Sequence, residues 1–247
     1  MPTITVIRSD LERLAGQPYS TDDLERALEI AKAEVKEEDG EHLRIQLKDT
    51  NRPDLWCAEG IARLLKGYRL GHYGDYDFLE SERSEGEVVV DASLRLIRPY
   101  IAAFACSDVH IDGASLEQLI EAQERLTENY GRGRSAVAIG IYDAADIRYP
   151  VHYEAVDPEA TAFVPLEFDV EMNLNQILRE HPTGRTYAHL LQGFDRYPFL
   201  RDDRGAVLSM PPVINSQTVG RVEVGDSFLF CEATGTQLES VLLSMAI

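Results

Sequence analysis

The residues best suited to chemistry lie toward the C-terminal end of the sequence. Residues 200–215 read LRDDRGAVLSMPPVIN, and two prolines directly after a predicted strand force an extended exit that presents Asn215 on rigid backbone. Glu232 stands at the end of an apolar strand predicted at residues 227–231, where a carboxylate is uncommon unless it has a partner. The pattern indicates a buried carboxylate and a fixed amide, although a turn, a loop asparagine and a capped helix start fit the same residues.

Signatures of other chemistries are missing from the sequence. The six histidines show no HxH or HExxH spacing, and no cysteine lies at ligand spacing from them. Neither GxGxxG nor GxxxxGK[ST] occurs; the nearest glycine-rich element is GRGR at 131–134, which fits a solvated loop or a phosphate contact. No serine sits in a GxSxG elbow. These observations argue against a metal site and against a serine–histidine–aspartate hydrolase.

The elements that position these residues begin with a small unit of strands and helices. Residues 3–8 alternate apolar and polar side chains like an edge strand, and Ser20 starts a helix as its N-cap. A second helix is predicted from about Asp54 to a C-cap at Gly67. Residues 71–87 are rich in Gly, Tyr, Ser and acids without a period, so we place a domain boundary in this stretch.

Strands and helices alternate after this boundary. The run 135–141 is nearly all apolar, which is typical of a strand covered on both faces. An apolar stripe from Leu238 to Met245 opens a helix close to residue 247, so we expect a C-terminal helix that is truncated. Helices are predicted at 115–130, 173–180 and 185–193, and strands at 88–92, 97–105, 163–168, 206–210, 220–224 and 227–232. The fold class is α+β: a small N-terminal α+β domain at 1–85 and a larger mixed α/β domain at 86–247.

The composition describes a folded, acidic chain. Among 247 residues, 43 are acidic and 24 basic, which gives a net charge of -19, while 44% hydrophobic residues exclude the disordered class. No apolar run reaches the ~18 residues of a membrane helix and no targeting segment is visible, so we expect a cytoplasmic protein without a membrane partner. RNA would be repelled by the average field, so any contact with it needs local arginines or a positively charged partner subunit.

Several motifs, in one order, resemble the beta subunit of phenylalanine–tRNA ligase of the archaeal and eukaryotic type. They are DTNRPDLWCAEGIA at 49–62, IRPY at 97–100, RSAVAIGI at 134–141, VLSMPPVIN at 207–215 and EATGT at 232–236. The resemblance implies that residues 1–85 form a B1-like domain and residues 86–247 a B3/B4-like editing domain. It also implies hydrolysis of tyrosine that has been wrongly esterified to phenylalanine tRNA.

The resemblance to the editing pocket of that family carries over six residues. Those implied to be catalytic are Ser209 and Asn215, and those implied to bind the substrate are Leu200, Arg221, Glu232 and Thr234. The implied partners are the 3′ end of tRNA(Phe) carrying tyrosine and, in the complete enzyme, the alpha subunit. No cofactor is expected in this fragment, and ATP and magnesium are expected only in the complete enzyme. The net charge of -19 favours the alternative of a non-catalytic tRNA-binding or subunit-assembly module.

Overall fold

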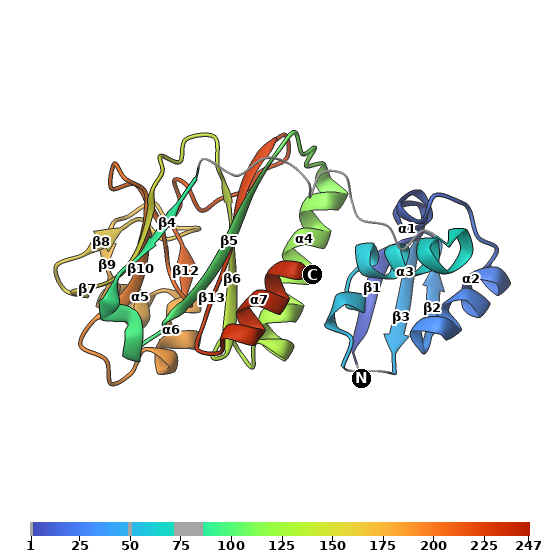
Figure 1. Ribbon diagram of the computed structural model, residues 1–247, viewed down its shortest axis with the longest axis horizontal. Coiled ribbons are helices and arrows are strands. Elements are labelled where there is room, and N and C mark those ends of the chain that lie inside the picture. The colour runs from blue at the N-terminus through green and yellow to red at the C-terminus, as the bar shows by residue number, and fades with distance from the viewer. Residues whose placement is uncertain (1, 49–50, 72–85) are drawn as a thin grey trace. The chain divides into compact units, whose positions relative to one another are not determined.

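The computed structural model describes residues 2–48, 51–71 and 86–247 (Figure 1). The chain divides into two units, the first formed by Met1–Glu82, Glu117–Leu126 and Ile247 and the second by Arg83–Leu116 and Thr127–Ala246. The domain boundary predicted between residues 85 and 86 adjoins residues 72–85, which lie outside the described residues. The division into 1–85 and 86–247 therefore stays a prediction.

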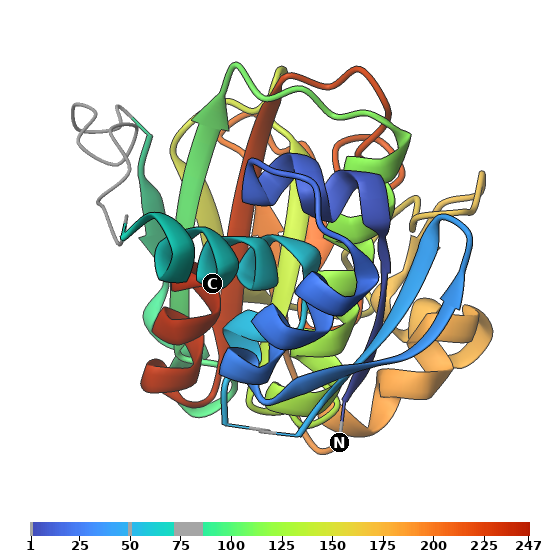
Figure 2. The same cartoon turned by 90° about the vertical axis from the view of Figure 1, so that its right-hand side faces the viewer.

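A three-stranded antiparallel sheet forms the base of the first unit. Its strand order is β1–β3–β2, with β1 at Thr3–Ile7, β3 at His42–Leu47 and β2 at Ala33–Asp39. The hairpin of β2 and β3 is the light-blue pair in Figure 2. Every second residue of β1 and β3 is buried, as the alternating sequence predicts.

Helices of this unit include α1 at Arg8–Ala15, α2 at Thr21–Leu28 and α3 at Ala58–Leu70. Ser20 is the N-cap of α2, and its side chain accepts a hydrogen bond from the Asp23 amide, as predicted. The predicted stop of α3 at Gly67 is wrong. The helix continues through Gly67 and ends at Gly71, whose φ of 64° is the left-handed conformation that commonly ends a helix.

The described part of the second unit is built mainly on two sheets, one of five strands and one of three. One has the order β12–β11–β10–β7–β4, antiparallel except for the parallel pair β4–β7. The other has the order β5–β13–β6 and is antiparallel, with its strands side by side in Figures 1 and 2. The strands are β4 (Val88–Val90), β5 (Tyr100–Ser107), β6 (Val137–Asp143), β7 (Val151–Val156), β10 (Tyr197–Arg201), β11 (Val207–Met210), β12 (Ile214–Asn215) and β13 (Phe228–Gly235), and a small separate pair is formed by β8 (Ala162–Phe163) and β9 (Met172–Asn173).

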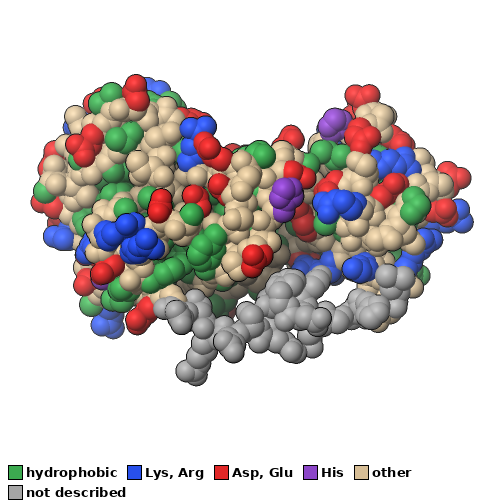
Figure 3. Space-filling model, turned by 90° about the horizontal axis from the view of Figure 1, so that it is seen from above, with side chains coloured by type: hydrophobic (Ala, Val, Ile, Leu, Met, Phe, Trp, Pro, Cys, Tyr) green, Lys and Arg blue, Asp and Glu red, His purple; other side chains and the backbone are tan. Residues whose placement is uncertain are grey.

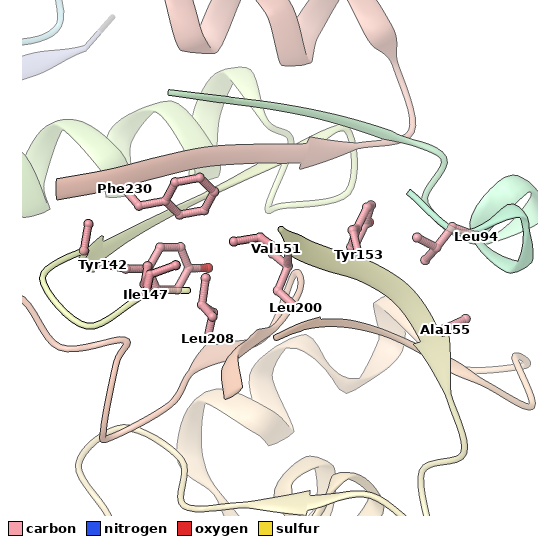
Figure 4. Close-up of a cluster of buried hydrophobic side chains, with 10 residues drawn as sticks. Leu94, Tyr142, Ile147, Val151, Tyr153, Ala155, Leu200, Leu208 and Phe230 are labelled. Carbon is pink, nitrogen blue, oxygen red and sulfur yellow. The ribbon is translucent and has the colours of Figure 1, made fainter. Parts of the chain in front are cut away.

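The core of the second unit lies between these two sheets. Buried side chains of β7, β10 and β11 meet Tyr142 of β6 and Phe230 of β13 in one hydrophobic cluster (Figure 4). The outer face of the larger sheet packs against α5 (Leu174–Glu180), and that of the smaller sheet against α7 (Leu238–Ala246). The fold is α+β, as predicted.

Other local features also differ from the prediction. The strand predicted at 163–168 is limited to β8 at Ala162–Phe163, and the helix predicted at 185–193 is α6 at Pro182–Tyr187 followed by a 3-10 turn at Ala188–Leu190. The helix α4 (Gly113–Arg125) begins before Ser115, because the Asp112 side chain accepts a hydrogen bond from the Ser115 amide at 2.7 Å. Residues 220–224 do not form a strand. The Gly220 amide, which would pair with a neighbouring strand, donates its hydrogen bond to the Ser216 hydroxyl oxygen. Among the described residues, no helix is long and apolar enough to cross a membrane.

Candidate functional site

The buried carboxylate predicted from the sequence is found on a central strand. Glu232 lies in β13, which is paired on both sides, and only 2% of the residue is exposed. It shares a strand face with Thr234 and with Phe230, which belongs to the cluster between the sheets. Its register partner on β6 is Gly140, where an added Cβ would lie 2.5 Å from Glu232 Oε1. A glycine is therefore required for this close approach.

A tyrosine hydroxyl connects the two sheets at Glu232. The Oη atom of Tyr142 lies 3.0 Å from Glu232 Oε1 and 2.8 Å from Ser209 Oγ, and all three residues are buried. A phenol carries one proton. When Glu232 is ionised, Tyr142 donates to the carboxylate and accepts from the Ser209 hydroxyl, because a carboxylate can only accept.

The electrostatics of this cluster favour a carboxyl that titrates near neutrality. Burial raises the pKa of Glu232 from 4.5 to about 7, while the hydrogen bond from Tyr142 and the positive charge of Arg98 act in the opposite direction. Burial and the neighbouring Glu232 charge raise the pKa of Tyr142, so its phenol keeps its proton. The second carboxylate oxygen, Oε2, is buried and has no hydrogen-bond partner among the residues that the structure describes.

A buried arginine fixes the end of the same strand. Arg98 donates from Nε to Thr234 Oγ1 at 3.0 Å and from Nη2 to the Thr234 carbonyl at 2.6 Å. Its own carbonyl accepts a hydrogen bond from the Tyr153 hydroxyl at 2.9 Å. Burial lowers the pKa of Arg98. The guanidinium holds Thr234 in place, and its positive charge lowers the pKa of Glu232.

Three predicted site residues lie in register on the larger sheet. Leu200 of β10 is opposite Ser209 of β11, which is opposite Asn215 of β12. Paired residues of antiparallel strands point to the same face, and Leu200 belongs to the cluster between the sheets. The Asn215 amide donates to the carbonyls of Ile141 on β6, at 3.3 Å, and of Gly220, at 3.1 Å. Asn215 thus links the two sheets beside Ser209.

Arg221 differs from the other predicted residues in its exposure to solvent. Its side chain is more than half exposed, and Nε lies 2.9 Å from a carboxylate oxygen of Glu223. The structure brings together Leu200, Ser209, Asn215, Glu232 and Thr234. Their predicted catalytic and binding roles, and that of Arg221, stay predictions.

Sequence reasoning missed Tyr142, Gly140 and Arg98. A glycine inside an apolar strand indicates close approach of another group, and this signal was present at Gly140. No local pattern in the sequence marks Tyr142 or Arg98 as part of a buried site. Only the pairing of distant strands shows that they contact Glu232 and Thr234. Within the described ranges there is no group of three or more His, Cys, Asp or Glu side chains placed to hold a metal ion.

Comparison with known proteins gives consistent results. No family model matches the chain. The chain is 42% identical over 251 residues to the phenylalanine–tRNA ligase beta subunit of Pyrococcus furiosus, 43% over 251 residues to that of Thermococcus kodakarensis and 40% over 253 residues to that of Borrelia hermsii. Each match covers 100% of this chain but only 43–45% of the relative. The chain therefore spans less than half the length of these curated relatives.

A solved structure agrees with this fold over nearly the whole length of the present chain. An N-terminal fragment of the phenylalanyl-tRNA synthetase beta subunit from Pyrococcus horikoshii superposes with a TM-score of 0.92 and 41% identity. The match covers 98% of this chain and 71% of that fragment. This fold thus occurs in a class of proteins, the aminoacyl-tRNA synthetase subunits. Within this class, the chain belongs to the phenylalanine–tRNA ligase beta subunit family.

Proposed function

We propose that the second unit is a B3/B4-type editing module of a phenylalanine–tRNA ligase beta subunit of the archaeal and eukaryotic type. Its reaction is hydrolysis of the ester that joins tyrosine to the 3′ end of tRNA(Phe). The alpha subunit, ATP and magnesium serve the aminoacylation reaction of the complete enzyme. The observation that carries the proposal is the buried carboxylate of Glu232, set among aromatic and aliphatic side chains with one oxygen unpaired.

There is a physical reason for a separate editing site that selects tyrosine. A pocket shaped for a phenyl ring discriminates only weakly against an analogue that adds a hydroxyl. The ratio of the two reaction efficiencies is about a hundredfold. A site that hydrogen-bonds the hydroxyl has the opposite preference, because a phenylalanyl group would leave the buried acceptor unpaired, at a cost of about 1–3 kcal/mol. Glu232 is the acceptor in this proposal, with Thr234 beside it and Leu200 as the apolar wall for the ring.

The reaction itself needs orientation of the ester and a water molecule. The water oxygen bonds to the ester carbonyl carbon, the bond from this carbon to the ribose oxygen breaks, and that oxygen leaves with a proton. Ser209 and Asn215 orient the ester or the water through their oxygens, which remain acceptors on rigid strands after Ser209 donates to Tyr142 and the Asn215 amide to Ile141 and Gly220. Arg221 meets the terminal adenosine or a phosphate from its exposed position.

The charge of the chain favours a second candidate, a non-catalytic module that binds tRNA or holds a partner subunit. Figure 3 shows acidic side chains interspersed with lysine and arginine on the visible face, and the net charge is -19. Such a surface attracts tRNA weakly by itself. Under this alternative the partner subunit supplies the positive surface, and the chain hydrolyses neither ester.

Deacylation by this chain separates the two candidates. Purified chain is mixed with Tyr-tRNA(Phe) or Phe-tRNA(Phe), and release of the amino acid is followed over time. We expect faster release of tyrosine, and a fall of about 100-fold or more for Asn215→Ala, because misplacing the reacting groups by about 1 Å costs this much. Asn175→Ala, on α5, removes an amide hydrogen-bonded to Glu159 and serves as the control. Release at the uncatalysed rate, or full activity of Asn215→Ala in a folded chain, contradicts the proposal.

A further inference from the structure

The Tyr142 hydroxyl is the group in the buried cluster that the proposed reaction has not used. It contacts both the proposed acceptor, Glu232, and the proposed orienting residue, Ser209. We propose that Tyr142 is a positioning residue: it holds Glu232 through Oε1 and so presents Oε2 to the hydroxyl of a bound tyrosyl group. This inference rests on the proposed function and adds a residue that determines its specificity.

The position of Tyr142 is itself fixed. Its ring is fully buried, lies 5.9 Å from the ring of Phe230, and points from β6 into the cluster between the sheets (Figure 4). Gly140 leaves the space for its hydroxyl, since a Cβ there would lie 2.1 Å from the Tyr142 oxygen. A ring held on all sides cannot follow a moving carboxylate, so the carboxylate is held by the ring.

A count of the available protons shows that the second carboxylate oxygen, Oε2, has no donor among the described residues. With Glu232 ionised, the single phenolic proton of Tyr142 goes to Oε1 and the Ser209 proton goes to the Tyr142 oxygen. Neither of these groups has a second proton for Oε2, and no other described protein group donates to it. A buried carboxylate oxygen without a donor is unfavourable, and a ligand hydroxyl would supply that donor. A phenylalanyl ring would not.

A different role for Tyr142 predicts the opposite behaviour. The Tyr142 phenol could occupy the place of the substrate phenol and so block Glu232, in which case removing its hydroxyl would improve tyrosine recognition. If Tyr142 only fills the core, removing the hydroxyl would slow both esters equally. The positioning role predicts a loss that is confined to the tyrosyl ester. The three roles are therefore distinguished by the ratio of the two deacylation rates.

The test compares Tyr142→Phe with the wild-type chain and with Tyr197→Phe. In the control, the lost hydroxyl is that of Tyr197, which donates to the Asn175 side chain. Tyr197 lies in the hydrophobic cluster between the larger sheet and α5. We expect Tyr142→Phe to slow deacylation of Tyr-tRNA(Phe) about tenfold or more, as loss of one hydrogen bond to a charged group does, and Phe-tRNA(Phe) less than about threefold. Tyr197→Phe should leave the ratio unchanged. An unchanged ratio in Tyr142→Phe, or faster tyrosine release, overturns the role of Tyr142.

A measurement on the unmodified chain covers the case in which Tyr142→Phe does not fold. With 13C-labelled tyrosine, the Tyr142 Cζ resonance should shift during a pH titration with the same midpoint as the Glu232 carboxyl, because protonation of the acid reverses the hydrogen bond between them. Titratable or charged groups around the pair are Arg98, Tyr153 and Cys231, which we expect to keep their protonation in this range. A Tyr142 resonance that stays flat while Glu232 titrates overturns the inference.

The two proposals fail in different ways. A wild-type chain that hydrolyses neither ester overturns the proposed function, and with it the role of Tyr142 in specificity. A wild-type chain that prefers the tyrosyl ester, together with an unchanged preference in folded Tyr142→Phe, overturns only the role of Tyr142.

Discussion

Replacing Glu232 by glutamine should change how the stability of the second unit depends on pH. Burial raises the pKa of this carboxyl from 4.5 to about 7. Each pKa unit corresponds to about 1.4 kcal/mol, so ionising the buried carboxyl costs the folded state about 3 kcal/mol. Glutamine has nearly the same shape and carries no charge at any pH. The glutamine variant should therefore escape this cost.

The sign follows from comparing the folded and unfolded chains. Below the unfolded pKa the carboxyl is protonated in both, and the group has no effect. Between pH 4.5 and about 7 the unfolded chain ionises while the folded chain stays protonated, so the free energy of unfolding falls as the pH rises. Above about pH 7 both are ionised, and the cost is constant. About 2 kcal/mol of this ionisation cost develops between about pH 5.5 and 8.

The assay must report on the second unit. The single tryptophan, Trp56, belongs to the first unit, so its fluorescence would follow the wrong transition. Hydrogen exchange of the β13 amides at increasing urea concentrations gives the unfolding free energy where Glu232 sits. We expect Glu232→Gln to gain about 2 kcal/mol relative to wild type from about pH 5.5 to 8.

The exposed carboxylate Glu239 provides the control, and Glu239→Gln should change by less than about 0.5 kcal/mol over the same range. A stability difference between wild type and Glu232→Gln that is the same at both pH values would refute the reasoning, because the buried carboxyl would then titrate as it does in the unfolded chain.

Two further substitutions test the same cluster. Gly140→Ala should lower the free energy of unfolding by about 1–3 kcal/mol, because its Cβ would overlap the two hydrogen-bonded oxygens; urea unfolding checks this against Gly113→Ala, where nothing lies within 4 Å. Arg98→Met should cost about 3 kcal/mol by removing the two hydrogen bonds that the guanidinium donates to buried Thr234, and should raise the pKa of the nearby glutamate above about 7, as carboxyl NMR would show. Equal stability of either variant and wild type would contradict these contacts.

The sequence was sufficient to predict elements that depend on local patterns. The α+β class, the apolar strand before Glu232 and the N-cap at Ser20 follow from periodicity and side-chain chemistry over a few residues. Local patterns failed where two signals of similar strength competed. Gly67 and Gly71 both fit a helix end, and only the left-handed backbone at the second decides between them.

The contacts of the site could not be predicted in this way. Tyr142 meets Glu232 across 90 residues of sequence, and the contact depends on the register of β6 against β13 and on the packing of two sheets. A period-two pattern gives the face of a strand but not the residue that will stand opposite. The expected strand at 220–224 failed for a related reason, since the Val219 and Gly220 amides donate to the Ser216 side chain and not to a neighbouring strand.

The placement of Glu232 on a strand that is paired along both edges has a consequence for how such a module can evolve. Neighbouring strands hold the backbone of β13 whatever side chain it carries. An exchange at this position for a shorter acid, an amide or an alcohol would thus alter the reach and charge of the acceptor while the sheet persists. Under the proposed function, a few such replacements on an inherited backbone would give modules with different amino-acid preferences.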